Sequence, residues 1–310
     1  MNILTSHITI GKYTFDYVHE LSIETGIENM TASGMVMLPK NLKFIKGQMK
    51  SEILRGDAVS IKLGYNGNLN TVFSGFVSSL NTGVPVEIKV QDLMWKLKQI
   101  QVNDVAKDET LKSFLQRNLP FEIDCFDIAL PKYVCHRKTG AQLLDMIRED
   151  FGFYVFVRNG KIVIGKQYDP QNYKRHRIKL DYNNVEEDLE YMIRDEINIK
   201  VTAISNLESG KKIEFEYGSS DGEEKTLNFY NLQKKELEEI AQKEYEKLRY
   251  DGYRGSVTIF GEPFVQAGDV IEIINDDDSD KNGSYWVDGV NYTFGVANGF
   301  RQECQLGART

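Results

Sequence analysis

Cysteine is scarce in this sequence, and no segment has the features of an export signal or a membrane span. The chain has 310 residues and three cysteines, an odd number with no close pair. A disulfide framework is therefore not expected, and assembly in a reducing cytosol fits. The cysteines are Cys125, Cys135 and Cys304. The N-terminal segment lacks the basic flank and apolar core of a signal peptide. No apolar run approaches the ~20 residues of a transmembrane helix, so membrane insertion is not expected.

Positive charge is also in short supply. The 46 Asp and Glu residues outnumber the 38 Lys and Arg residues, which gives a net charge of −8. Proteins that bind nucleic acids generally use basic patches, so general nucleic-acid binding is disfavoured. The composition, 41% hydrophobic and 27% charged, is that of an ordinary soluble protein. The length allows two or three modest domains.

Recognised catalytic motifs are absent as well. The sequence has no P-loop, no dinucleotide fingerprint after a strand and no G-x-S-x-G motif. The pair His19-Glu20 fails as a zincin motif, because Ile23 occupies the position three residues after Glu20. Cys125, Cys135 and His136 do not have the spacing of a closed zinc site. The sequence therefore predicts neither catalytic residues nor a cofactor, and it favours a structural or interaction protein over an enzyme.

One loop carries part of a calcium-binding pattern. Asp278, Asp280, Asn282 and Gly283 fit the first half of the D-x-D-x-N-G loop. The position that should hold the bidentate glutamate is Gly289, and the flanking segments are strands rather than helices. We interpret residues 276–283 as a solvated hairpin loop, with calcium ligation by the three polar residues as the alternative.

A three-strand pattern near the C-terminus organises the rest of the interpretation. Residues 265–306 contain a Gly268-Asp269 pair, then alternating β-branched residues from Val270 to Ile274, then two further apolar runs separated by polar loops. Short alternating runs separated by Asn, Asp and Gly are typical of a β-meander.

The same pattern occurs once more, in residues 54–90. Gly56 and Asp57 again come before a strand, and residues 73–77 match residues 287–291. Asp57 and Gly75 are 18 positions apart, while Asp269 and the matched Gly289 are 20 apart. The order and spacing predict an internal duplication of one small β-domain, marked by the two Gly-Asp turns.

Helical segments interrupt the β patterns. We expect a helix from Leu111 that stops before Pro120, and a second helix that Thr139 caps and Gly152 ends. Asn159-Gly160 then predicts a tight hairpin. Further on, residues 230–250 form the clearest helical pattern in the chain, with one apolar stripe and a Lys/Glu-rich remainder.

These patterns predict an α+β, mainly β protein with two similar small β-barrel domains. The first barrel is expected over residues 1–102, an inserted α/β domain over 103–168, and the second barrel over 169–310 with the helix 230–250 inserted. Barrels are preferred because an open sheet of so few strands would leave its edges exposed.

The order of these elements resembles a known family. The similarity lies in residues 8–39, 88–92 and 159–165, and in the closing segments FGEPFVQAGDVIEI and YWVDGVNYTFGVANGFRQECQLG. It is to the baseplate hub proteins of bacteriophage tails and related contractile injection systems, of the late control protein D type.

The resemblance implies a homotrimer whose two tube domains per chain form a pseudo-sixfold ring. Such a ring adapts a trimeric central spike to a hexameric tail tube, and a duplicated chain supplies the two quasi-equivalent copies this requires. The implied partners are the tail tube protein, the central spike protein and other baseplate proteins. The implied location is the virion, assembled in the cytoplasm of the bacterial host. We also expect an acidic lumen, if the Asp/Glu excess faces inward, through which DNA passes without specific binding.

The chain lacks an obvious needle extension or lysozyme-like domain, so we expect it to depend on a separate spike protein.

Three alternatives stay open at this point. A hub of a phage-derived protein-delivery system would have the same fold and a different cargo. The other two are a tail-associated cell-wall-degrading enzyme and a glycan-binding module using Trp95 or Trp286, although core positions are preferred for both tryptophans.

Overall fold

The computed structural model describes residues 3–39, 53–81, 83–207 and 209–310. It is mainly β, as predicted, with 54% strand and 15% helix. The segment 41–53, which the sequence left ambiguous, lies outside the described residues apart from Ile53. Within the described part of the chain, no helix combines the length and apolarity needed to cross a membrane.

The elements fall into three groups along the chain. The first group is β1 (Leu4–Ile10), β2 (Tyr13–Phe15), β3 (Glu20–Gly26), β4 (Ser33–Leu38), β5 (Ala58–Tyr65), β6 (Asn68–Asn81) and β7 (Val86–Gln91). The second is α2 (Met94–Leu97), β8 (Gln101–Thr110), α3 (Leu111–Asn118), β9 (Ile123–Cys125), β10 (Ala129–Thr139), α4 (Gly140–Phe151), β11 (Tyr154–Arg158) and β12 (Lys161–Gly165). The third is β13 (Arg175–Lys179), β14 (Asn184–Met192), η1 (Arg194–Glu196), β15 (Ile199–Asn206), β16 (Lys212–Gly218), β17 (Glu223–Tyr230), α5 (Lys234–Leu248), β18 (Gly252–Phe260), β19 (Val270–Ile274), η2 (Ser279–Lys281), β20 (Gly283–Gly295) and β21 (Gly299–Arg309).

Two sets of six strands have the same topology. We call β1, β3, β4, β5, β6 and β7 repeat 1, and β13, β14, β18, β19, β20 and β21 repeat 2. The sheet order is β1-β5-β6-β7-β4-β3 in repeat 1 and β13-β19-β20-β21-β18-β14 in repeat 2. Numbered along each repeat, both orders read 1-4-5-6-3-2. One difference is that the first strand is antiparallel to the fourth in repeat 1 and parallel to it in repeat 2.

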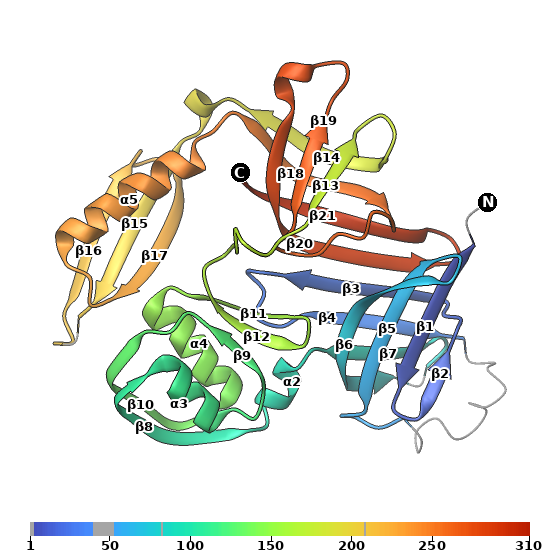
Figure 1. Ribbon diagram of the computed structural model, residues 1–310, viewed down its shortest axis with the longest axis horizontal. Helices are drawn as coiled ribbons and strands as arrows, with labels where there is room; N and C mark the ends of the chain where they lie inside the picture. The colour runs from blue at the N-terminus through green and yellow to red at the C-terminus, as the bar shows by residue number, and fades with distance from the viewer. Residues whose placement is uncertain (1–2, 40–52, 82, 208) are drawn as a thin grey trace.

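The two repeats share one sheet. The second half of β20 pairs with β3, from Gly289 opposite Gly26 to Gly295 opposite Glu20, so that a 13-stranded sheet spans both repeats. Figure 1 shows the long strands β20 and β21 running beside β3 and β4. None of the sheets closes on itself among the described residues. The expectation of two separate barrels is therefore not confirmed, because here each repeat covers an edge of the other instead of closing its own.

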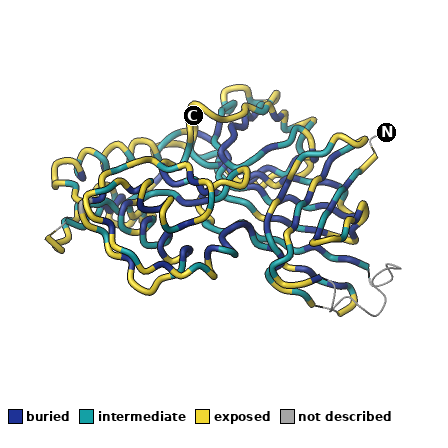
Figure 2. Tube along the Cα trace, turned by 60° about the horizontal axis from the view of Figure 1, so that its bottom comes forward, coloured by how far each residue is buried: buried dark blue, intermediate teal, exposed yellow. Residues whose placement is uncertain are grey.

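One apolar cluster fills the space behind this sheet. It includes Ile8, Leu21 and Val36 from repeat 1 together with Val257, Val290 and Phe300 from repeat 2. The alternation that predicted the strands places these side chains on one face and polar side chains on the other. Figure 2 shows the result as buried stretches alternating with more exposed ones along the strands near the N-terminus.

The first insert has its own core and the helix caps that the sequence predicted. The Thr110 hydroxyl accepts a hydrogen bond from the Ser113 N–H at the start of α3. Thr139 and Gln142 form a capping box at the start of α4, and Gly152 ends that helix with φ +67°. The hairpin at Asn159 joins β11 to β12 as expected. Because these signals act within a few residues of the chain, sequence alone located them well.

The second insert is larger than the helix that the sequence predicted. Strands β15, β16 and β17 form a separate three-stranded sheet, and α5 packs on it through Leu237 and Ala241. The predicted second barrel, residues 169–310, included these three segments, whereas in the structure they form a sheet of their own. An alternating apolar pattern predicts that a segment forms a strand, but it does not predict which strand that segment pairs with.

The two inserts lie on the same side of the main sheet in Figure 1 and contact each other. The Phe151 and Tyr230 rings are 5.1 Å apart. At Gly152, an added Cβ would lie 1.9 Å from the Asn228 carbonyl oxygen, so only glycine allows α4 to end against β17.

Asp92 joins repeat 1 to the first insert and carries a pH prediction. Its carboxylate is 2% exposed and accepts hydrogen bonds from the N–H groups of Ala32 (2.8 Å) and Met94 (2.9 Å). Burial raises the pKa of Asp92 to about 6, against the lowering effect of these hydrogen bonds. As the pH falls, Asp92 is therefore protonated at a higher pH in the folded protein than in the unfolded chain, where the pKa of an Asp is about 3.9.

The sign of this linkage is opposite to that of most carboxylates. As the pH falls from above 6 to about 4, the Asp92 contribution should raise the free energy of unfolding of the wild type relative to Asp92→Asn by roughly 2–3 kcal/mol. Urea unfolding of both proteins across this pH range measures the difference. A difference that stays constant with pH would contradict the prediction.

Candidate functional site

The turn before β5 is fixed by four hydrogen bonds around Gly56 and Asp57. The Gly56 N–H donates to the Val77 carbonyl (2.8 Å), and the Val77 N–H donates to the Asp57 carbonyl (2.9 Å). The Asp57 N–H donates to the Leu54 carbonyl (3.1 Å), and the Asp57 carboxylate accepts from the Leu54 N–H (2.8 Å). Gly56 has φ +96°, in the region that favours glycine.

The turn before β19 repeats this arrangement bond for bond. The Gly268 N–H donates to Val287 (2.8 Å) and the Val287 N–H donates to Asp269 (2.9 Å). The Asp269 N–H donates to Gln266 (3.0 Å), and the Asp269 carboxylate accepts from the Gln266 N–H (3.0 Å). Gly268 has φ +86°. The same four bonds at the same positions support a duplication of the unit that the two Gly-Asp turns mark.

These hydrogen bonds also correct the register of the repeat. They make Val77 the counterpart of Val287, whereas the sequence match placed Val77 opposite Asn291. A strand irregularity follows at the equivalent residue in each repeat, at Ser78 and at Asp288. The sequence match was wrong because the connection between the fourth and fifth strands differs: a two-residue hairpin at Asn66-Gly67 in repeat 1, and a loop with a 3-10 turn in repeat 2.

The two aspartates differ in their surroundings. The Asp269 side chain is 1% exposed and lies 3.2 Å from Arg158 Nη2 and 3.1 Å from His176 Nε2, and it also accepts from the Lys174 N–H (3.1 Å). Burial raises the pKa of Asp269, but the hydrogen bonds from His176, Lys174 and Gln266 outweigh it, so the pKa is lowered. Asp269 thus joins the first insert to strand β13 and to the turn before β19 at one buried carboxylate.

The sheet face opposite the apolar core is polar and acidic. The strand registers from β14 to β6 place seven carboxylates on it and three cations, an excess of four negative charges. The carboxylates are Glu20, Glu24, Glu87, Glu186, Asp188, Glu190 and Glu303, and the cations are Lys89, Arg254 and Arg301. A hollow of about 990 Å³ lies on this face across the junction of the repeats, between Glu24, Lys89, Asn291 and Glu303. Both repeats contribute strands to this face.

The two tryptophans pack against other aromatic rings. Trp95 is buried and stacks on Phe76 with ring centroids 5.9 Å apart. Trp286 is partly buried, stacks on Tyr168 at 4.7 Å and meets the edge of Tyr173 at 5.0 Å. Both rings thus pack against neighbouring aromatic side chains, although of the two only Trp95 has the buried position that the sequence interpretation preferred.

The loop with the partial calcium pattern is held by bonds within the hairpin. The Asp278 carboxylate pairs with Lys281 Nζ (2.9 Å), and the Asn282 side-chain oxygen accepts from the Asn275 N–H (2.7 Å). Asp280 lies in the short η2 turn between them. Throughout the part of the chain that the structure describes, no group of three or more His, Cys, Asp or Glu side chains is placed to hold a metal ion.

The residues considered for a zinc site, Cys125, Cys135 and His136, have different surroundings in the structure. Cys135 is buried in the core of the first insert, while the His136 ring shares a 2.8 Å hydrogen bond with Asn103. Burial raises the pKa of the Cys125 thiol to about 12, which makes it a poor thiolate donor.

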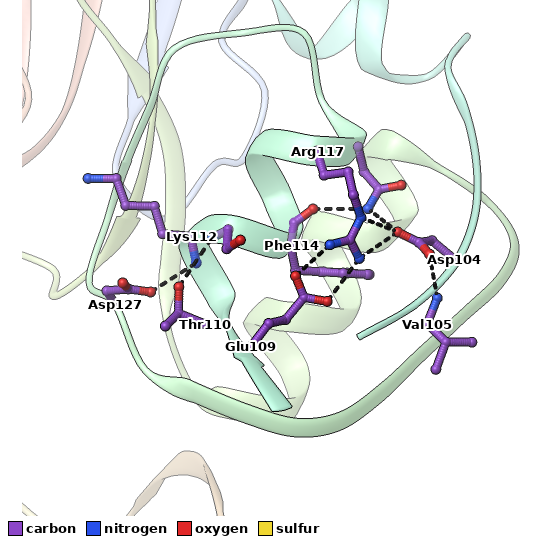
Figure 3. A network of polar contacts seen from close by, with 10 residues as sticks. Asp104, Val105, Glu109, Thr110, Lys112, Phe114, Arg117 and Asp127 are labelled. Atoms are coloured by element: carbon purple, nitrogen blue, oxygen red, sulfur yellow. Dashed lines mark hydrogen bonds and ion pairs between the residues drawn. The ribbon is translucent and has the colours of Figure 1, made fainter. Parts of the chain in front are cut away.

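A charged network on the first insert was not anticipated from the sequence (Figure 3). Arg117 on α3 donates to both carboxylate oxygens of Glu109 (2.6 and 2.9 Å) and to Asp104 (2.9 Å) on the neighbouring strand β8. Hydrogen bonds from Asn118 and Arg117 lower the pKa of Asp104. The network fastens α3 to the neighbouring strand β8.

A second pair of glycines marks the repeat and was also missed. Gly34 on β4 faces Ile23 on β3, and Gly255 on β18 faces Leu189 on β14. A Cβ at either glycine would lie within 2.5 Å of a backbone oxygen of the facing strand, that of Ser22 or of Asp188. Isolated glycines within strands gave no signal of their own, because only the register reveals that they are equivalent.

Comparison with known proteins identifies the fold. No protein-family model matches the chain, and no curated protein matches it. Among solved structures, the chain is similar to a tail protein from Neisseria meningitidis MC58, with TM-score 0.69 and 16% identity over 99% of this chain and 97% of that one. It is also similar to the 43 kDa tail protein of prophage MuSo2 from Shewanella oneidensis, with TM-score 0.67 and 14% identity over 98% and 96%.

A third similar structure comes from a secretion system. The E. coli c3393 protein is described as a component of the type VI secretion system with structural similarity to the T4 bacteriophage tail proteins gp27 and gp5. The match has TM-score 0.61 and 9% identity, over 98% of this chain and 77% of that one. The chain thus has the fold found in phage tail proteins and in a type VI secretion component, along its whole length.

Proposed function

We propose that this chain is a baseplate hub protein of a phage tail, of the late control protein D type. In this proposal three chains form a pseudo-sixfold ring that adapts a trimeric central spike to a hexameric tail tube. The observation that carries it is the duplicated six-strand unit with its two identically bonded turns. A trimer of a duplicated chain presents six quasi-equivalent surfaces, which is what a hexameric partner requires.

The acidic sheet face supports a lumen role. It is shared by both repeats and carries an excess of negative charge, so a ring that turned these faces inward would line its channel with carboxylates. Such a surface repels phosphate and would let DNA pass without specific binding. The channel-lining role applies to the ring and not to the single chain.

The test is the mass of the purified protein by light scattering, with negative-stain imaging of the same peak. We expect a trimer with six lobes and a central hole. If the chain is monomeric alone, addition of the spike protein should produce the ring. A monomer under both conditions contradicts the proposed function, and a ring with its acidic faces outward contradicts the lumen role.

A protein-delivery machine is the second candidate, and the type VI secretion component among the similar structures favours it. It uses the same ring with a different cargo. Neighbouring genes for a capsid and a terminase support the phage tail, and neighbouring genes for an ATPase and toxins support the delivery machine.

We propose no enzymatic role. A tail-associated cell-wall enzyme should clear a suspension of bacterial cell walls, and we expect this chain to leave the turbidity unchanged over a wide pH range. Clearing by the purified chain would contradict this expectation and support the enzyme alternative.

A further inference from the structure

Among the described residues, the main sheet has several unpaired strand edges, including those of β14 and of the last residues of β6. Strand β14 pairs with β18 along one edge and with nothing along the other. Residues 79–81 of β6 pair with β7, while the pairing of β6 with β5 ends at Phe76. Unpaired edges expose backbone N–H and C=O groups and are ready positions for a further strand.

The counterparts of these edges in the other repeat are paired with each other. β14 corresponds to β3, since each is the second strand of its repeat. Residues 79–81 of β6 correspond to 289–291 of β20, since these follow the equivalent irregularities at Ser78 and Asp288. Within the chain, β3 and this part of β20 form the junction of the two repeats.

Side chains at the two places agree with this equivalence. Asn291 donates to Glu303 across the polar face (3.4 Å) and lies opposite Glu24 of β3. Asn81 donates to Glu87 at the same distance of 3.4 Å. The intact junction therefore has a row of Glu24, Asn291 and Glu303, and the open edge of β6 has the last two members of that row.

Strand β14 supplies the counterpart of Glu24, which is the member of the row that the open edge of β6 lacks. Ile23 faces Gly34 as Leu189 faces Gly255, which makes Glu190 the counterpart of Glu24. Glu190 is exposed on the polar face of β14. The equivalent pairing would thus place Glu190 opposite Asn81.

We propose that residues 79–81 of one chain pair antiparallel with residues 190–192 of β14 in a second copy, with Asn81 opposite Glu190. This inference rests on the proposed ring and names its contact between subunits. The occupant is a second copy because β14 and β6 are separated by six strands in one sheet path, so the two edges cannot pair with each other within one chain. The contact between chains would then repeat the junction already present within each chain.

Disulfide cross-linking tests the register. In the double variant Asn81→Cys/Glu190→Cys, the two cysteines are directly opposite across the contact, close to the Cβ separation that a disulfide needs. Mild oxidation of the protein at high concentration should give covalent dimers and trimers on a non-reducing gel. The yield should be at least about tenfold above that of Asn81→Cys/Leu189→Cys, because a one-residue change of register moves the side chain to the other face.

The single variants and the wild type control for the native thiols, of which Cys135 and Cys304 are buried. Light scattering of each variant before oxidation separates the outcomes. A trimer that cross-links only in the matched pair supports the proposal. A trimer without cross-links, or with equal cross-linking in the mismatched pair, overturns this contact and leaves the proposed function standing. A monomer at every concentration, with or without the spike protein, overturns both.

Discussion

Replacement of Asp269 by alanine is expected to lower the free energy of unfolding by about 3–5 kcal/mol, the cost of breaking the ion pair with Arg158 by removing its buried partner. The variant leaves Arg158 and His176 without their carboxylate, and it removes the acceptor of the Lys174 and Gln266 N–H groups. Because these groups come from the first insert, the residue before β13 and repeat 2, the loss should affect the packing of the first insert against repeat 2. Urea unfolding followed by tryptophan fluorescence measures it, since Trp286 pairs directly with the residue after Asp269.

Repeat 1 provides a matched control. Asp57 makes the same turn and accepts the same hydrogen bond from the residue three positions earlier, but the described contacts give its carboxylate no cation. Asp57→Ala should therefore cost only about 1 kcal/mol, the net value of one ordinary hydrogen bond. Equal losses in the two variants would show that the turn itself, and not the buried charge cluster, accounts for the effect.

Asp269 also makes the free energy of unfolding depend on pH, with a sign opposite to that of Asp92. The pKa of Asp269 is lower in the folded protein, so its stabilising contribution is present above the unfolded pKa of about 3.9 and is lost as the pH falls through the folded pKa. Asp269→Asn should therefore lose its stability disadvantage relative to the wild type in strong acid, whereas the Asp92 difference develops between about pH 6 and 4.

Gln302→Met is expected to destabilise the fold by about 3–5 kcal/mol, although it preserves the size of the side chain. Gln302 is fully buried; its side-chain oxygen accepts from the Val265 N–H (2.9 Å), and its amide nitrogen donates to the carbonyls of Phe260 and Pro263 (2.8 Å each). Methionine leaves the buried Val265 N–H and two partly buried carbonyl acceptors unpaired, at about 1–3 kcal/mol for each group that finds no water. Thermal and urea unfolding measure the loss.

The neighbouring Leu306→Met is the control for this substitution. Leu306 lies on the same strand and the same apolar face and is 6% exposed, so a swap that conserves volume should cost less than about 1.5 kcal/mol. A small loss in both variants would mean that water replaces the hydrogen bonds of Gln302. The counterpart of Gln302 in repeat 1 is Val86, which agrees with a local role: this glutamine holds the loop before the second Gly-Asp turn.

Local signals in the sequence were sufficient for several elements. Thr139 and Gly152 located α4, Asn159-Gly160 located a hairpin, and the two Gly-Asp pairs located two turns with identical hydrogen bonds. Each of these depends on residues a few positions apart, where backbone sterics and capping bonds decide the conformation. The mainly β class followed from alternation of apolar residues, which also depends only on neighbouring positions.

The sequence by itself thus determined the mainly β class, the helices α3, α4 and α5, and the presence of a repeat. Only the tertiary structure decided the register of that repeat, the separate sheet of β15, β16 and β17, and the junction of β3 with β20. The junction depends on strand edges that meet across more than 250 residues, as between Glu20 and Gly295. A strand edge carries backbone groups that are the same in every strand, so its partner is selected by the packing of the whole sheet over the common core and leaves no local mark in the sequence.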